Sequence, residues 1–186
     1  MEENLQYVRE PAKRIFAQEL QESNLTYKEE DDQYSKQYLI TQTGARINRL
    51  YITGTLIEKE NIGNETEYWR ARITDPTGAF FIYAGQYQQE AADAIVRIEP
   101  PGFVAVIGKP NIYTTPEGAT MTSVRPETIQ VIEEDTIDQW IVDTAHQTLQ
   151  RLNDKDNPVA KQASAHYQTD LTRYKEMIIT ALSAVR

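Results

Sequence analysis

Apolar and polar residues alternate through the middle of the chain, from about residue 38 to residue 132. The apolar members are mostly β-branched or aromatic, and glycine, proline, asparagine or aspartate bounds each run, which is typical of β-strands. Between the third and fourth runs, apolar residues follow a helical spacing that stops at two prolines. The pattern predicts strands over 49–60, 67–74, 79–85, 103–113 and 119–132, and a helix within 87–101.

This order of elements predicts a particular barrel. Three strands, one helix and two strands is the order of the OB-fold, a small five-stranded Greek-key barrel. Gly54 falls in the middle of the first strand, where a barrel needs a bend or a bulge. We therefore predict a mainly β fold with flanking α: an OB-fold barrel with an N-terminal helix and C-terminal helices.

Both ends of the chain differ from this middle part. Helical spacing predicts a helix over 7–22, followed by a polar stretch without a period, 23–36, that is typical of a linker or an arm. After the barrel, the spacing predicts helices over 135–152 and 159–186. The predicted domains are 1–37 (N-terminal helix and acidic arm), 38–132 (OB-fold) and 133–186 (C-terminal helices for subunit assembly).

The net charge limits the kinds of partner. The 186 residues carry a formal charge of -9, and 40% of them are hydrophobic. Phosphate contacts need clustered lysine and arginine, so this acidity argues against indiscriminate DNA binding. Residues 41–132 are the least acidic part, with 8 basic and 10 acidic residues. A local basic surface on an acidic protein fits these numbers.

Several classes of function lack the residues they need. The chain has no cysteine, and its two histidines, His146 and His166, have no zinc-site spacing. The sequence has no Ser/His/Asp spacing and no phosphate-binding loop, so we predict no enzyme activity, no metal and no cofactor. The N-terminus lacks the apolar core of a signal peptide, and the longest apolar run is 103–108. We predict a cytoplasmic protein without a membrane segment.

The hairpin WRARITDPTGAFFIYAGQY, 69–87, carries the most specific chemistry. DPTG is a compact turn, which Asp75 is expected to organise through its carboxylate. Side chains alternate along a strand, so Trp69, Ala71 and Ile73 share one face of the second strand. The opposite face then holds Tyr68, Arg70 and Arg72, and on the third strand Phe81 and Tyr83 point away from Phe80, Ile82 and Ala84.

The outward set suits single-stranded nucleic acid. The second and third strands of an OB-fold form its usual oligonucleotide surface. Aromatic rings stack under bases at roughly 1–3 kcal/mol each, and arginines meet phosphates. The predicted nucleic-acid-binding residues are Tyr68, Arg70, Arg72, Phe81 and Tyr83, with Lys59, Lys109, Tyr113 and Arg125 extending the basic track. The alternative is a plain solvated surface, or one that a helix or a partner covers.

A family resemblance rests on this hairpin, on PPGFVAVIGKPNIY (100–113) and on SVRPETIQVI (123–132). Together with the opening REPAKRIFAQEL (9–20), these segments resemble the archaeal replication protein A-associated proteins. Those proteins are similar to the middle, single-OB subunit of replication protein A. The resemblance covers nearly the whole chain.

The resemblance implies a single-stranded-DNA-binding subunit of an archaeal replication protein A-type complex that acts in replication, repair and recombination. It implies a hetero-oligomer with the large subunit of that complex, in which the helix after the barrel makes the subunit contact. The expected contact set is Ile137, Trp140, Ile141, Ala145 and Leu149. The alternative is an assembly or recruitment subunit that binds the large subunit without touching DNA. The sequence leaves open whether the acidic arm (EEDD, 29–32) lies over the arginine face.

Overall fold

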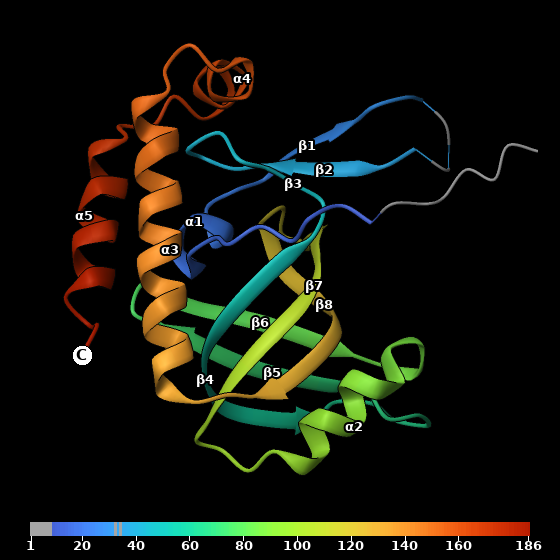
Figure 1. Cartoon of the computed structure of the whole chain (residues 1–186). Coiled ribbons are helices and arrows are strands. Elements are labelled where there is room, and N and C mark those ends of the chain that lie inside the picture. Colours follow the sequence, from blue (N-terminus) through green and yellow to red (C-terminus); the bar gives the residue numbers. More distant parts are fainter. Residues whose placement is uncertain (1–8, 32, 34) are drawn as a thin grey trace, which may run out of the picture.

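The computed structural model describes residues 9–31, 33 and 35–186, and its centre is a closed barrel of five strands (Figure 1). The strands follow one another around the barrel in the order β4-β5-β6-β8-β7. Their bounds are β4 Leu50–Asn61, β5 Trp69–Asp75, β6 Gly78–Ala84, β7 Gly102–Thr114 and β8 Thr120–Val131.

The pairing of these strands is that of an OB-fold. All neighbouring strands are antiparallel except β6 and β8, which run parallel where Ile82 faces Val124. The helix α2, Gln89–Arg97, lies between β6 and β7 in the chain, after a short 3-10 turn, Gln86–Gln88. The predicted five-stranded OB-fold with flanking helices is therefore confirmed.

Gly54 is required by a close approach between strands. A side chain there would begin 2.3 Å from the carbonyl oxygen of Thr74 on β5, which is too close for any residue but glycine. The β-bulge lies two residues further on, between Leu56 and Glu58. The inward side chains of all five strands fill the barrel, among them Ile52, Leu56, Ala71, Ile73, Phe80, Ile82, Val104, Val106, Val124 and Ile129.

The N-terminal helix is much shorter than predicted. Within the described part of the predicted range, only Ala17–Gln21 is helical (α1), and residues 9–16 form no helix. The backbone of Lys13 pairs with β4, donating to the Arg49 carbonyl at 2.9 Å and accepting from the N–H of Tyr51 at 3.0 Å. This pairing with the barrel outweighs the local helical pattern. Val8, which belonged to that pattern, lies outside the described residues.

The polar stretch predicted as a linker or arm is folded where the structure describes it. β1, Leu25–Lys28, pairs with β2, Gln37–Ile40, and β2 pairs with β3, Arg46–Ile47. The small antiparallel sheet they form projects from the barrel (Figure 1). Each of its strands has only two to four residues, which is too short for an alternation of apolar and polar residues to predict a strand.

Three helices follow the barrel: α3 Glu134–Asn153, α4 Pro158–Tyr167 and α5 Thr172–Leu182. The predicted helix over 135–152 is confirmed by α3. The single helical pattern over 159–186 is wrong, because Gln168 adopts a left-handed conformation (φ 53°) that ends α4 before α5 begins. No helix in the described part of the chain is long and apolar enough to cross a membrane.

The helix α3 packs along the barrel, with α5 at its other side (Figure 1). The ring nitrogen of Trp140 donates to the carbonyl oxygen of Tyr51 at 2.8 Å, and its ring meets Phe16 edge-on at 5.5 Å. On α5, the hydroxyl of Tyr174 donates to Glu22 just after α1. The three predicted domains thus contribute to one buried cluster, and their division at 37 and 132 stays a prediction.

Candidate nucleic-acid interface

The hairpin of β5 and β6 has the two faces that alternation predicts. Ala71 and Ile73 on β5 are fully buried in the barrel, while Arg70 and Arg72 point outward and are half-buried. The strand register pairs each outward arginine with an outward aromatic residue of β6: Arg70 with Tyr83, and Arg72 with Phe81. The fold therefore places two arginine–aromatic pairs side by side on one surface.

The turn between the strands is held by Asp75. Its carboxylate accepts hydrogen bonds from the backbone N–H of Thr77 at 2.7 Å and of Gly78 at 3.0 Å, as its expected role requires. It also accepts from the N–H of Ala17 at 2.8 Å, the first residue of α1. Burial raises the pKa of Asp75, and these hydrogen bonds oppose the rise. The turn thus anchors α1 to the barrel.

Tyr68 and Tyr83 form a stacked pair on the outward surface. Their ring centroids lie 6.0 Å apart and the ring planes are inclined by 27°. Gly85 makes room for this arrangement, because a side chain there would begin 2.8 Å from the ring of Tyr68. Tyr68 comes from the loop after β4 and Tyr83 from β6, so the pair joins the loop to the sheet. Such a two-ring platform offers flat area to a base.

Tyr113 extends the aromatic surface at the other end. Burial raises the pKa of the Tyr83 hydroxyl, the neighbouring Tyr113 raises it further, and Arg70 lowers it. Tyr113 lies near the end of β7 beside the 115–119 turn, and its hydroxyl meets the sulfur of Met121 at 3.2 Å. The aromatic surface thus runs between the loop that follows β4 and the loop that follows β7.

Acidic residues of β4 accompany the arginines, which the sequence analysis missed. Glu60 lies opposite Arg70 in the register, and its carboxylate accepts a hydrogen bond from the Arg70 guanidinium at 2.6 Å. Glu58 lies opposite Arg72, whose buried Nε has no hydrogen-bond partner among the described residues. The signal was the alternation of Glu58 and Glu60 on β4, which places both on the outward face. They reduce the positive charge that the surface presents.

Phe81 is half-buried, so it is neither fully covered nor a freely exposed ring. The helix α1 packs against β6, and the side-chain amide of Gln21 donates to the carbonyl of Ala79 at 3.2 Å.

The acidic arm does not pair with the arginine face where it is described, because Glu29 binds Arg46 at 2.9 Å. Asp32, in the same arm, lies outside the described residues.

Lys59 lies on a different side from the predicted basic track. Its register partner on β5 is the buried Ala71, so its side chain is on the inward side, at the barrel end that α2 closes. Its ammonium group donates to the carbonyl oxygens of Ile95 at 3.1 Å and Val96 at 2.7 Å, in the last turn of α2. A lysine at a helix C-terminus is a structural partner of the helix.

Lys109 and Arg125 are cross-strand partners on β7 and β8, both exposed. They line a hollow of about 460 Å³ together with Tyr87, whose side chain is 87% exposed just after β6. Because β8 follows β6 around the barrel, this pair continues the outward surface beyond Tyr83. Tyr87 was not among the predicted residues, although an aromatic residue three positions after a strand end is a recognisable signal.

Most of the predicted subunit-contact residues are buried inside this chain. Trp140, Ile141 and Ala145 are 1–3% exposed, and Ile137 packs against the same cluster. With α3 in this position, those side chains meet the barrel and α5, not a partner. Leu149 alone of the set is well exposed, at 42%.

Comparison with known proteins supports the fold and gives no family. No known family profile matches the chain, and no curated protein matches its sequence. A chain of the S. pombe Stn1–Ten1 complex aligns with 82% of this chain and 96% of its own length, at 14% identity and a TM-score of 0.51.

Two further solved structures align with less than half of this chain. The second single-stranded-DNA-binding protein (SSBb) of Mycobacterium smegmatis matches 46% of this chain and 87% of its own, at 10% identity and a TM-score of 0.40. The S. cerevisiae mitochondrial single-stranded-DNA-binding protein Rim1 matches 46% and 94%, at 17% identity and a TM-score of 0.35. The class of this protein is therefore an OB-fold protein with flanking helices.

Proposed function

We propose that the protein binds single-stranded DNA on the outward surface of β5 and β6. The stacked pair Tyr68 and Tyr83, next to Arg70, is the observation that carries this proposal. The rings offer stacking area that does not depend on base identity, and the arginines offer charge to the backbone. Binding is expected to be weakly sequence-specific and salt-sensitive.

The finer part of the proposal is membership of an archaeal replication protein A-type complex, in replication, repair and recombination. It rests on the sequence resemblance, and two of the similar solved structures, SSBb and Rim1, are single-stranded-DNA-binding proteins. The large subunit would then supply most of the DNA affinity, which accommodates a companion chain with a net charge of -9. This subunit is proposed to act in the cytoplasm, without catalysis of its own.

A titration of a labelled thymidine 30-mer, read by fluorescence anisotropy, tests the DNA surface. Replacing both Tyr68 and Tyr83 by alanine is expected to weaken binding by about 1–3 kcal/mol per stacked base lost. The pair Phe81→Ala and Tyr83→Ala is likewise expected to cost a few kcal/mol at most. Tyr27→Ala, an exposed tyrosine on β1, is the matched control. Unchanged affinity in folded double variants would contradict the proposed surface.

A second candidate function is an assembly subunit that binds the large subunit without touching DNA. The ion pair of Arg70 with Glu60 favours it, because that guanidinium is already neutralised. Exposed apolar residues also lie on the two outer helices: Val142 and Leu149 on α3, and Ile179 and Leu182 on α5. These replace the buried Trp140 and Ile141 as the proposed contact set.

Co-purification with a candidate large subunit tests this second function. Leu149→Asp combined with Ile179→Asp is expected to abolish the complex while leaving the barrel folded. Val131→Asp, on the exposed end of β8, is the control. Normal stoichiometry in the double variant would remove α3 and α5 as the assembly surface.

A further inference from the structure

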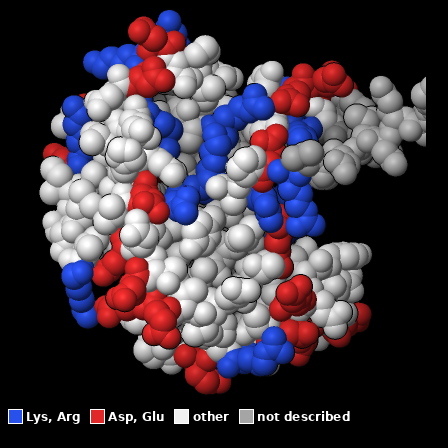
Figure 2. Space-filling model, in the orientation of Figure 1, with Lys and Arg blue, Asp and Glu red and all other residues white. Residues whose placement is uncertain are grey.

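A second cationic site lies away from the barrel surface described above. It is a hollow of about 450 Å³ between the extended segment 12–14, the loop and strand 43–46, and the junction of α3 and α4. Figure 2 shows lysine and arginine side chains gathered on this face, between α3 and the small sheet. The cations that line the hollow are Lys13, Arg14, Arg46 and Arg151, and Asp154 is the one carboxylate among the described lining residues.

The fold brings these cations together from distant parts of the sequence. The pairing of Lys13 with β4 fixes the first wall. Gly44, at φ +89°, lets the second wall touch α4, because a side chain there would begin 2.7 Å from the Cα of Ala160. Arg151 comes from the last turn of α3, more than one hundred residues further along the chain. Nothing in the local sequence predicts such a cluster.

Two of the arginines are oriented by partners behind them. Arg46 pairs with Glu29 at 2.9 Å and lies over the ring of Tyr38, 4.0 Å from its centroid. Arg151 donates to the hydroxyl of Thr43 at 2.8 Å and meets the buried Glu19 at 3.4 Å. Each guanidinium has five N–H donors, so these bonds leave donors for a ligand.

Arg14 and Lys13, the other two cations, have fewer hydrogen-bond and ion-pair partners among the described residues. Arg14 lies 5.0 Å from the ring centroid of Tyr51 and reaches Asp143 only at 4.0 Å. Its buried Nε has no hydrogen-bond partner among the described residues. Lys13 makes no ion pair in the described part of the chain. Burial lowers the pKa of Lys13, and repulsion from Arg151 and Arg46 lowers it further. An anion placed among these groups would relieve that repulsion.

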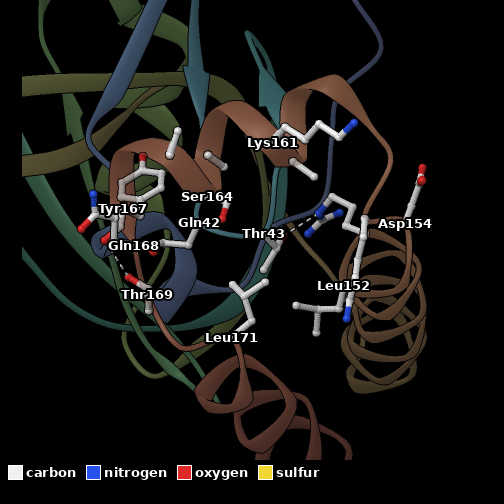
Figure 3. A pocket seen from close by; sticks show the side chains of 15 residues that line it. Gln42, Thr43, Leu152, Asp154, Lys161, Ser164, Tyr167, Gln168, Thr169 and Leu171 are labelled. Carbon is white, nitrogen blue, oxygen red and sulfur yellow. Dashed lines mark hydrogen bonds between the residues drawn. The ribbon is translucent and has the colours of Figure 1, made fainter.

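A larger neighbouring cavity differs in character. It measures about 640 Å³ and shares Thr43, Arg151, Asp154 and Ala160 with the cationic hollow. Figure 3 shows Leu152 and Leu171 on one side of it and Lys161 on the other. Lys155 and Lys161 line this second cavity and carry positive charge onward from the hollow. Its apolar wall does not suit an anion, so the cationic hollow alone is assigned here.

We propose that the hollow around Lys13 binds a phosphate-bearing anion, at a site separate from the β5–β6 surface. Arginine forks bind phosphate oxygens in pairs, and the exposed ammonium group of Lys13 adds a point charge between them. The three arginines and one lysine match a ligand with more than one phosphate group. Successive phosphates of a nucleic-acid backbone and a free polyphosphate share this chemistry.

Two probes distinguish these sources: inorganic tripolyphosphate, titrated by calorimetry, and a thymidine 30-mer, titrated by anisotropy. Both are used with the full chain and its variant Lys13→Gln, which removes the charge and leaves the backbone pairing in place. Lys175→Gln, on the exposed side of α5, is the matched control with the same change in charge. Repeating the DNA titration in the Tyr68→Ala, Tyr83→Ala background separates this site from the barrel surface.

The site is expected to lose about tenfold in affinity for its anion in Lys13→Gln and nothing in the control. Loss for tripolyphosphate alone identifies a free phosphoanion, and loss for the 30-mer in both backgrounds identifies a nucleic-acid backbone. Equal affinity of Lys13→Gln and Lys175→Gln for both probes would overturn the proposal. Should Lys13→Gln not fold, amide shifts in the unaltered protein decide: tripolyphosphate must perturb Gly44 and Ala45, and shifts confined to other regions reject the site.

Discussion

The carboxylate of Asp75 accepts a hydrogen bond from the backbone N–H of Ala17, 2.8 Å away and 58 residues earlier in the chain. The same carboxylate closes the turn between β5 and β6. One half-buried side chain thus joins the hairpin that carries the candidate DNA surface to the first helix. Positioning of that surface therefore depends on a contact that neither segment makes alone.

We expect Asp75→Ala to lower the free energy of unfolding by about 1–3 kcal/mol, because it leaves the N–H group of the buried Ala17 without its acceptor and removes the hydrogen bonds that close the turn. Urea denaturation followed by circular dichroism measures this. Asp93→Ala, an exposed aspartate on α2, is the control and is expected to change stability little. Equal stability of the two variants would show that the Asp75 bonds do not contribute.

Replacing Trp140 is expected to lower the stability of the folded chain, and any effect on a subunit contact would follow from that loss. Its side chain is 1% exposed, packs on Phe16 and donates to Tyr51, so Trp140→Ala should cost about 3–5 kcal/mol. Thermal denaturation provides the measurement. Leu149→Ala, on the exposed side of the same helix, should cost far less. A stable Trp140→Ala chain would mean that α3 does not pack on the barrel in solution.

Lys59→Met is expected to destabilise the chain by about 1 kcal/mol and to leave DNA affinity unchanged. The ammonium group binds the last carbonyls of α2, so its loss removes a favourable charge at a helix C-terminus. Urea midpoints and DNA anisotropy are measured on the same preparation. A large loss of DNA affinity at unchanged stability would return Lys59 to the binding surface.

Glu60→Gln is expected to strengthen DNA binding several-fold if the β5–β6 surface is used. Removing the carboxylate frees the Arg70 guanidinium, which it binds at 2.6 Å, for a phosphate. The slope of log affinity against log salt should then steepen by about 0.7, the value for one added contact to a single strand. The control is Glu176→Gln, an exposed glutamate on α5, which makes the same charge change elsewhere.

The salt slope also separates two explanations. A gain in affinity with Glu60→Gln and with Glu176→Gln alike would reflect net charge only. A gain confined to Glu60→Gln would indicate a direct phosphate contact by Arg70.

Alternation and turn chemistry in the sequence determined the barrel and both faces of its central hairpin. The side chains of Ala71 and Ile73 point inward, and those of Arg70 and Tyr83 outward, because side-chain direction in a strand follows from position alone. The DPTG turn also followed from local sequence, because the Asp75 carboxylate accepts hydrogen bonds from the backbone N–H groups two and three positions ahead.

Tertiary structure decided what local patterns do not record. The segment around Lys13 has helical spacing but is extended, because its backbone pairs with β4. Trp140 was predicted to meet a partner, yet the chain's own barrel covers it. The acidic partner of Arg70 and the cluster around Lys13 depend on which strands and helices become neighbours. Glu60 and Arg70 are ten residues apart on adjacent strands, whereas Lys13 and Arg151 come from opposite ends of the chain, and only strand register and packing bring such groups together.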